Sequence, residues 1–550
     1  MACRHHDAEP QGGSDRSEGP GPSGQADLIV VGGEIWTGDP ARPEVDALAA
    51  AGGRVLALGG RAEVEALRGP RTAVLELAGG LAVPGLVDAH AHLLGLGAEM
   101  DQADLRGAAS IDEVVARTKK AAPPSGWVLG RGWDQNLWPE KAMPTHAPLT
   151  AAFPDRSVWL RRIDGHAGWA NRAALAAAGI TRATPDPQGG EILRDAGGEP
   201  TGVLVDAAMN LVPVPEPGDE DLRRRILVAQ ERVLALGLTG VHEMGVGPRA
   251  DAILRGLAAD GSLKLRMTGY ADEAWFTKDL AHEQRPPLPG PELRYRLVGV
   301  KIYVDGALGS RGAALLAPYA DRPGHSGILM HAPGELDAVV LAAVRGGWQV
   351  AAHAIGDRGI RVLLDALAAA RAAVPAGAPR LRVEHAQIVD LADVPRFASL
   401  GAVASMQPTH ATSDMTWVPE RLGRERLAGA YAWRRFLDAG VPLAFGSDFP
   451  VELPDVVHGL HAAVTREDAE GRPPGGWLPD QRLALAEALA AFTSGAAYAA
   501  GQSEWCGRLA PGMVADLTCF RADLRALAPA DLRGAAVQAT VVGGALAWQG

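Results

Sequence analysis

Residues 81–92 read LAVPGLVDAHAH, an apolar run that ends in two histidines separated by one residue. Successive side chains of a β-strand point to opposite faces, so His90 and His92 project to the same side. The run therefore predicts a strand whose C-terminal end presents two imidazoles to one point.

Further apolar runs between Leu81 and Gly501 have the same form and bring the total to eight. They are SVWLRRIDGH (157–166), LTGVHEMG (238–245), LVGVKIYVDG (297–306), WQVAAHAIGD (348–357), LRVEHAQ (381–387), AVASMQPTH (402–410) and VPLAFGSD (441–448). Ala-, Leu- and Arg-rich stretches with helical spacing separate them, such as residues 220–237 and 358–374. This alternation predicts an α/β protein in which residues 81–504 form a (β/α)₈ TIM-like barrel.

An open, doubly wound α/β sheet is the structural alternative. None of the candidate strands is followed by a G-x-G-x-x-G or Walker loop. Each candidate strand instead ends at His, Asp, Glu or Lys, and the C-terminal strand ends are where barrel active sites lie. The pattern favours the barrel.

The two ends of the chain have a different texture. Residues 1–26 combine Gly, Ser, Pro and charges with almost no apolar residue, which predicts a disordered tail. Residues 27–80 and 505–550 both contain short β-rich runs separated by glycine turns, such as DLIVVGGEIWTG and AAVQATVVGGALAWQG. We expect the two segments to build one composite β-sandwich.

Composition narrows the class of protein. The 550 residues carry a net charge of −12 at pH 7, which argues against nucleic acid and anionic membranes as partners. The 3 cysteines are too few and too scattered for a disulfide framework or a thiolate zinc cluster. With no apolar signal segment and no apolar run long enough to span a membrane, we expect a cytoplasmic protein.

Three more metal-competent side chains end other predicted strands: His353, His385 and Asp448. An isolated His-x-His pair also fits two satisfied or exposed histidines, but in a closed barrel these strand ends converge on the axis. Zinc and similar divalent ions accept imidazole and carboxylate ligands in catalytic sites. The set therefore predicts a metal centre.

Lys301 lies in the apolar run VGVKIYVDG, where an unpaired ammonium group is costly to bury. It could extend to solvent or pair with Asp305. Alternatively, it could react with carbon dioxide to form a carbamate, which turns the cation into a bridging oxygen ligand.

Taken together, the motifs of this chain resemble the amidohydrolase superfamily and, within it, the amidohydrolase 3 or YtcJ-like branch. Besides His-x-His, the segments that carry the resemblance are GRGWDQNLWP (130–139), WLRRIDGHAGWANRAAL (159–175), KIYVDGALGSRGAALL (301–316), HAIGDRG (353–359), VEHAQ (383–387), QPTHATSDM (407–415) and FGSDFPVE (445–452). This branch includes N-substituted formamide deformylases. The resemblance implies hydrolysis of a carbon–nitrogen bond other than a peptide bond, in a small amide, N-substituted formamide or cyclic amide.

The resemblance also assigns roles to the strand-end residues. It implies one or two divalent ions per chain, most often zinc, with His90 and His92 on one metal and His353 and His385 on the other. Carboxylated Lys301 would bridge them, and Glu243 on the preceding strand is the alternative ligand. Asp448 would contact the metal and act as the general acid/base toward a metal-activated water.

A further set of polar and aromatic residues falls in motif segments and is assigned to the substrate pocket: Trp133, Asp134, His166, Asp305, Arg311, Gln407 and His410. Each could instead cap a turn, or form a hydrogen bond with a metal ligand on the side of that ligand that faces away from the metal. The tryptophans at 133, 138, 159 and 169 could form an aromatic wall for an apolar N-substituent or be ordinary core packing.

Two other functions remain open on the sequence. The same metal site could cleave an ester, lactone or phosphoester, because activated hydroxide does not itself select the bond. The protein could also be a metal-free relative that acts as a binding protein, although all of the expected metal ligands are present in this chain. We expect a small-molecule substrate, and the resemblance implies a homodimer.

Overall fold

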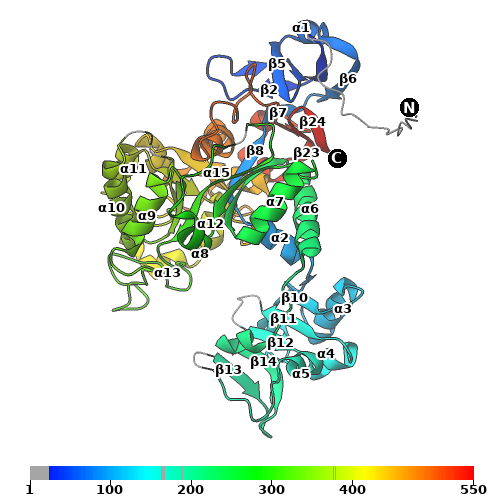
Figure 1. The fold of residues 1–550 in the computed structure, drawn as a ribbon, viewed down its shortest axis with the longest axis vertical. Helices are drawn as coiled ribbons and strands as arrows, with labels where there is room; N and C mark the ends of the chain where they lie inside the picture. Colours follow the sequence, from blue (N-terminus) through cyan, green and yellow to red (C-terminus); the bar gives the residue numbers. More distant parts are fainter. Residues whose placement is uncertain (1–23, 163–166, 188–189, 289, 376, 378) are drawn as a thin grey trace, which may run out of the picture.

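The protein is described here from a computed structural model, which covers the chain apart from residues 1–23, 163–166, 188–189, 289, 376 and 378 (Figure 1). Most of the expected tail therefore lies outside the described residues, and so does His166. The described chain divides into a central barrel, a β-sandwich beside it and an inserted α/β unit.

An eight-stranded, all-parallel sheet forms the centre of the molecule. In spatial order its strands are β8 (Leu86–Ala91), β15 (Leu238–Val246), β16 (Arg266–Ala271), β17 (Tyr295–Tyr303), β18 (Gln349–Ala354), β19 (Leu381–His385), β20 (Val403–Met406) and β21 (Leu443–Phe445). The Asp448 amide, just after β21, donates to the His90 carbonyl in β8 at 2.8 Å, so the sheet curls into a nearly closed barrel. The predicted barrel fold is confirmed.

Helices cover the outside of the barrel. They include α2 (Leu93–Met100), α6 (Asp219–Ala235), α7 (Pro248–Ala259), α9 (Glu335–Arg345), α10 (Asp357–Ala373), α11 (Val394–Leu400), α14 (Trp433–Asp438), α15 (Val456–Thr465), α16 (Leu485–Ala490) and α17 (Ala496–Ala499). In α10 the apolar residues Ile360, Leu363, Leu364 and Leu367 recur at helical spacing and are buried, while Arg361, Asp365 and Arg371 are partly or fully exposed. Strands such as β17 are buried along almost their whole length because a parallel barrel covers both faces of each strand.

One prediction of a barrel strand is wrong, because the segment forms a strand outside the barrel. Residues 158–162 of SVWLRRIDGH form β11 (Val158–Arg162), which pairs with β10 and β12 in a different sheet. Its place in the barrel is taken by β16, whose sequence RMTGYA carries no polar ligand at its end. Both segments satisfy the local pattern of a strand, and only tertiary pairing separates them.

The inserted unit follows α2 and contains a six-stranded sheet with three helices. Its elements are β9 (Ala103–Asp104), α3 (Ile111–Ala121), β10 (Val128–Trp133), α4 (Ala147–Ala152), β11, β12 (Ala167–Ala170), α5 (Arg172–Ala177), β13 (Gly190–Arg194) and β14 (Pro200–Asp206). Figure 1 shows it projecting from the barrel on the side opposite the sandwich. The expected barrel segment 81–504 therefore contains a unit with its own sheet and core.

The sandwich has two sheets. The first contains β5 (Arg54–Gly59), β4 (Ala47–Ala51), β1 (Ala26–Val31) and β6 (Arg68–Glu76), and α1 (Arg61–Glu65) lies against it. The second contains β24 (Ala545–Gln549), β23 (Val537–Val542), β22 (Leu517–Phe520), β7 (Leu81–Pro84), β2 (Glu34–Trp36) and β3 (Glu44–Val45). Buried residues from both chain ends, such as Leu28 and Val541, share one core between the sheets. The sandwich extends to β7, four residues beyond the expected boundary at residue 80.

Two short helices follow β20 and border the open end of the barrel: α12 (Pro408–Asp414) and α13 (Val418–Leu422). Among the described residues, no helix combines the length and the apolar character that a membrane span requires.

Candidate metal centre

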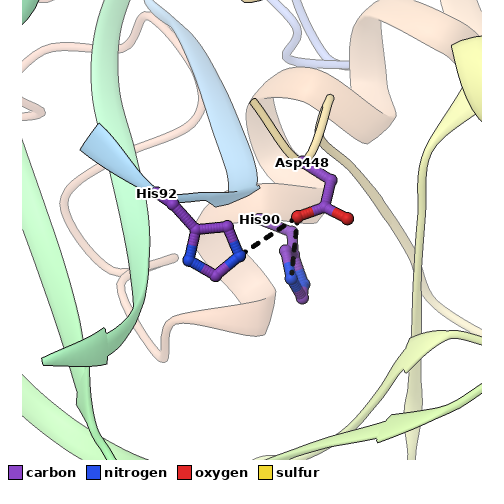
Figure 2. Close-up of side chains that lie close together, drawn as sticks. All are labelled: His90, His92 and Asp448. Carbon is purple, nitrogen blue, oxygen red and sulfur yellow. Dashed lines mark ion pairs between the residues drawn. The ribbon is translucent and has the colours of Figure 1, made fainter. Parts of the chain in front are cut away.

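His90, His92 and Asp448 meet at the open end of the barrel. His90 lies in β8, His92 directly follows it, and Asp448 follows β21 (Figure 2). The Oδ1 atom of Asp448 is 3.1 Å from His92 Nε2 and 3.6 Å from His90 Nε2. Asp448 adopts a left-handed backbone conformation, with φ of 62°, that a non-glycine residue rarely adopts outside functional sites and turns.

The histidines share one hydrogen-bonding pattern. The Nδ1 of His90 donates to Glu384 at 2.6 Å, that of His92 to the Met244 carbonyl at 2.9 Å, and that of His385 to Gln407 Oε1 at 2.9 Å. An acceptor at Nδ1 fixes the neutral tautomer in which Nε2 keeps its lone pair. Each ring is therefore oriented with a metal-competent nitrogen on the other side.

His353 completes the set from β18. Its ring centroid lies 4.5 Å from that of His385, and its Nε2 is buried without a hydrogen-bond partner among the described residues. Asp305 lies beside it, with Oδ1 3.7 Å from His353 Nε2. The carboxylate of Asp305 accepts hydrogen bonds from the amides of Ala314, Ile355 and Gly356, so it is a buried anchor of the surrounding loops.

Burial and neighbouring charges set the protonation states. Burial, together with the charge of Lys301, lowers the pKa of His90 to about 4 and that of His353 to about 3. Burial opposes ionisation of Asp448, but the surrounding imidazoles, His90 foremost, hold its pKa well below the ordinary value. Burial also opposes charging of His92, but its hydrogen bond to Asp448 and the charge of that carboxylate raise the pKa of His92 above the ordinary value. His90 and His353 are thus in the neutral form in which imidazoles bind metal ions.

Lys301 and Glu243 occupy different positions. Lys301 is buried in β17, lines the cavity, and its Nζ lies 3.2 Å from His90 Nε2. Burial lowers the pKa of Lys301 to about 8, which makes the free amine accessible near neutral pH. Glu243 instead accepts hydrogen bonds from the amides of Leu93 and Leu94 and so holds the first turn of α2. Of the two, Lys301 is the one that faces the cavity.

A buried ion pair between Arg382 and Glu384 holds His90 in place, and the sequence analysis selected neither residue. Arg382 and Glu384 are both 0% exposed, and Arg382 Nε donates to Glu384 at 2.7 Å. Arg382 also donates to His242, Tyr270 and Ser405. The signal was present in LRVEH, where two charged residues with the period of a strand interrupt an apolar run.

The centre opens into a cavity of about 400 Å³. The predicted residues that line it are His90, His92, Lys301, His353, His385, His410 and Asp448. Its outer wall contains residues that sequence reasoning did not select, including Tyr303, Gln387, Asp414, Trp417 and Glu452. A cavity of this size accommodates a small-molecule substrate.

His410 differs from the other histidines. Its Nδ1 accepts from the Gln387 amide at 3.2 Å, so the proton of the neutral ring lies on Nε2. This Nε2 is buried, has no hydrogen-bond partner among the described residues, and lies 3.8 Å from Asp448 Oδ2. His410 therefore presents a donor to the cavity, whereas Gln407 acts behind His385.

Three predicted pocket residues lie elsewhere in the structure. Trp133 is fully buried in the core of the inserted unit, where it stacks on Trp138, and its indole nitrogen donates to the Leu160 carbonyl. Asp134 forms an ion pair with Arg162 at 2.8 Å in the same unit. Arg311 pairs with Asp321 at 2.7 Å and is not part of the described cavity lining. The aromatic wall is thus core packing, because rings of this size stabilise a small separate unit best when they are buried.

The donor set fits a divalent metal ion. One nitrogen or oxygen from each of His90, His92 and Asp448 lies within 4.8 Å of the others. Imidazole and carboxylate ligands with an open cavity beside them are typical of catalytic rather than structural metal sites. The buried Nε2 of His353, which has no hydrogen-bond partner among the described residues, is available to such an ion.

Comparison with known proteins agrees with this geometry. The model of the amidohydrolase family matches residues 73–547. The chain is 36% identical to the protein LONG AFTER FAR-RED 3 of Arabidopsis thaliana, covering 94% of this chain and 91% of that protein. It is 33% identical to the putative amidohydrolase YtcJ of Bacillus subtilis (87% and 91% covered) and 30% identical to an N-substituted formamide deformylase of Arthrobacter pascens (95% and 98% covered).

A solved structure shares the architecture over nearly the whole chain. An uncharacterized metal-dependent hydrolase from Pyrococcus horikoshii superposes with a TM-score of 0.77 at 29% identity, covering 91% of this chain and 99% of that one. The family match, the barrel and the histidine-aspartate centre agree, and the chain belongs to the amidohydrolase family.

Proposed function

We propose that this protein hydrolyses a carbon–nitrogen bond other than a peptide bond in a small amide, N-substituted formamide or cyclic amide. The observation that carries the proposal is the set of histidines whose outward nitrogens are each held by an acceptor, so that their Nε2 atoms surround ionised Asp448 in an open cavity. The similarity to an N-substituted formamide deformylase supports the choice of bond.

We assign His90, His92 and Asp448 to one zinc ion, and His353 and His385 to a second. A bound divalent ion supplies Lewis acidity and makes hydroxide available near neutral pH. Lys301 is proposed as the bridge after its neutral amine adds to carbon dioxide, which forms an N–C bond and releases one proton. The lowered pKa of Lys301 supports this step, because only the free amine reacts.

Asp448 is proposed as the general acid/base. Its carboxylate is ionised at neutral pH and faces the cavity, so it can accept a proton from the attacking water. It then delivers that proton to the nitrogen that leaves. The hydrogen bond from its own amide to the His90 carbonyl fixes the carboxylate relative to β8.

His410 is proposed to orient the substrate carbonyl. Its Nε2 proton points into the cavity near Asp448 and has no other acceptor among the described residues. A donor placed there stabilises negative charge that develops on the carbonyl oxygen. Asp305 and Gln407 are proposed to position His353 and His385 rather than to touch substrate.

The test combines elemental analysis of the purified protein with hydrolysis assays on N-substituted formamides and simple cyclic amides. We expect one or two zinc equivalents per chain and amide cleavage that a chelator abolishes and zinc restores. Metal without amide cleavage, but with cleavage of an ester or lactone, would replace the proposed bond. A protein that takes up no metal even when zinc is supplied would refute the proposal.

A further inference from the structure

Two carboxylates besides that of Asp448 line the catalytic cavity. Asp414 lies at the end of α12, and Glu452 lies in the loop four residues after Asp448. Among the described residues that line this cavity, Lys301 is the only lysine or arginine, and it is buried beside His90. The outer wall of the cavity is therefore negatively charged.

Neither carboxylate forms an ion pair within the part of the chain that the structure describes. Asp414 accepts a hydrogen bond from the Tyr431 hydroxyl. Burial raises the pKa of Asp414 above its ordinary value, and the nearby His410 and the Tyr431 hydroxyl offset only part of this rise. A positive group next to Asp414 would offset the rest.

Two aromatic rings also line this cavity. The ring of Tyr303, which is 43% exposed, lies 5.5 Å from that of His353 and 5.0 Å from Lys301 Nζ, and the Arg421 guanidinium lies 5.8 Å from the centre of the Trp417 ring. The face of an aromatic ring attracts a cation. Together with the charges of Asp414 and Glu452, these rings favour a cationic group over an apolar one.

A second cavity of about 450 Å³ adjoins the first and shares Glu452 with it. Its described lining includes Glu467, Asp468 and Glu470 but no lysine or arginine. Arg472 pairs with Asp468 and Glu470 and offsets part of this charge. A cleft lined by one sign of charge concentrates ligands of the opposite sign, so cations are drawn toward the shared wall.

We propose that the active site selects substrates whose N-substituent carries a positive charge, and that Asp414 and Glu452 bind that charge while the scissile bond lies next to Asp448 and His410. The choice of scissile bond rests on the proposed function, whereas the binding of the cation does not. For a formamide the reaction is R–NH–CHO + H₂O → R–NH₃⁺ + HCOO⁻, with the positive charge carried in R.

The binding test uses two molecules of nearly the same shape, choline and 3,3-dimethylbutan-1-ol, titrated calorimetrically into the zinc-loaded protein. We expect choline to bind at least about fivefold more tightly at low salt, as one ion pair and one cation–π contact allow, and the preference to shrink as salt is added. Glu452→Gln and Asp414→Asn should each reduce the preference. Glu504→Gln removes an exposed acid outside both cavities and should leave it unchanged.

Choline binding no tighter than that of the alcohol, including no measurable binding of either, would overturn the inference. So would a preference that persists in the Glu452→Gln/Asp414→Asn double variant. Circular dichroism and zinc content of each variant identify any that fail to fold, and the single variants then decide the question.

A kinetic test separates this inference from the proposed function. N-[2-(trimethylammonio)ethyl]formamide and N-(3,3-dimethylbutyl)formamide differ only in charge, and we expect kcat/KM to favour the first, mainly through KM. Equal hydrolysis of both would overturn the inference and leave the proposed function standing. Hydrolysis of neither, together with a choline preference in the binding test, would overturn the proposed function and leave the inference standing.

Discussion

At the scale of single residues, the centre depends on groups that never touch the substrate. Glu384, the Met244 carbonyl and Gln407 each accept a hydrogen bond from an imidazole Nδ1, so three imidazoles turn their Nε2 lone pairs toward the cavity. Such hydrogen bonds fix both tautomer and ring orientation, and they are commonly as important to metal affinity as the ligands. The expected ligand set is thus supported by acceptors contributed by three different segments.

Replacing Asp448 by asparagine tests its role as acid/base. The amide keeps the size of the side chain but cannot accept the proton of the attacking water, so we expect kcat to fall by a factor of about 10² or more. Zinc content should remain largely intact because histidine ligands remain. Steady-state kinetics on a formamide with parallel metal analysis checks this, and near-normal turnover in the variant would remove Asp448 from the mechanism.

Glu384→Gln tests the ion pair beneath His90. The substitution removes the charge that orients His90 and leaves Arg382 buried without its partner carboxylate. We expect zinc affinity to fall about 10- to 100-fold, measured by competition with a chelator of known affinity. Because breaking a buried pair also costs stability, circular dichroism must confirm folding. Unchanged zinc affinity in a folded variant would contradict the positioning role.

At the scale of elements, the site is built where β21 closes against β8. The Asp88 carboxylate accepts from the backbone amide and the hydroxyl of Ser447, and the Asp448 amide donates to His90. These contacts join the first and last barrel strands and place Asp448 above the histidines. The contacts that close the barrel therefore also assemble the candidate metal centre.

Gly446 makes this close approach possible. A Cβ atom at Gly446 would lie 2.5 Å from both Asp88 Oδ1 and the His90 amide nitrogen. We expect Gly446→Ala to destabilise the protein by about 1–3 kcal/mol and to weaken zinc binding. Gly256→Ala is the matched control, since it adds the same methyl group within helix α7 where nothing lies within 4 Å. Thermal denaturation measures the stability of both variants, and a Gly446→Ala variant as stable as Gly256→Ala would refute the proposed role of Gly446.

At the scale of the whole molecule, the sandwich is attached to the closed end of the barrel. The Thr518 hydroxyl donates to the Gly237 carbonyl just before β15, and Arg266 at the start of β16 pairs with Asp516 just before β22. The active site opens at the other end of the strands. The C-terminal part of the sandwich thus holds the base of the barrel, while the loops at the open end can vary and so change which substrate binds.

Metal removal should be visible in the stability of the molecule. The proposed zinc ligands are side chains that only the folded barrel brings together, so zinc at a free concentration 100 times its Kd should stabilise the native state by about 2.7 kcal/mol. We expect a chelator to lower the midpoint of thermal unfolding and added zinc to restore it, as measured by calorimetry. An identical midpoint in the two states would contradict a metal at this site. The homodimer and the cytoplasmic location stay predictions.

Much of the candidate site could be predicted from local patterns. A strand has a period of two and a parallel barrel aligns its C-terminal ends, so His90, His92, Lys301, His353, His385 and Asp448 could be expected to meet. The barrel follows from the same alternation of strands and helices. These features depend on short stretches of chain and on a topology that the order of elements already implies.

Tertiary structure alone decided which strand-like segments pair with which. Residues 158–162 and 266–271 are both short strands, yet the first joins the inserted sheet and the second joins the barrel. It also decided that Trp133 is core, that Arg311 turns to Asp321, and that Asp414 and Glu452 face the same cavity as His90. The sequence by itself determined the periodicity of each element and the chemistry at its end. Which segments distant along the chain contact each other depends on packing and burial, and no local sequence pattern contains that information.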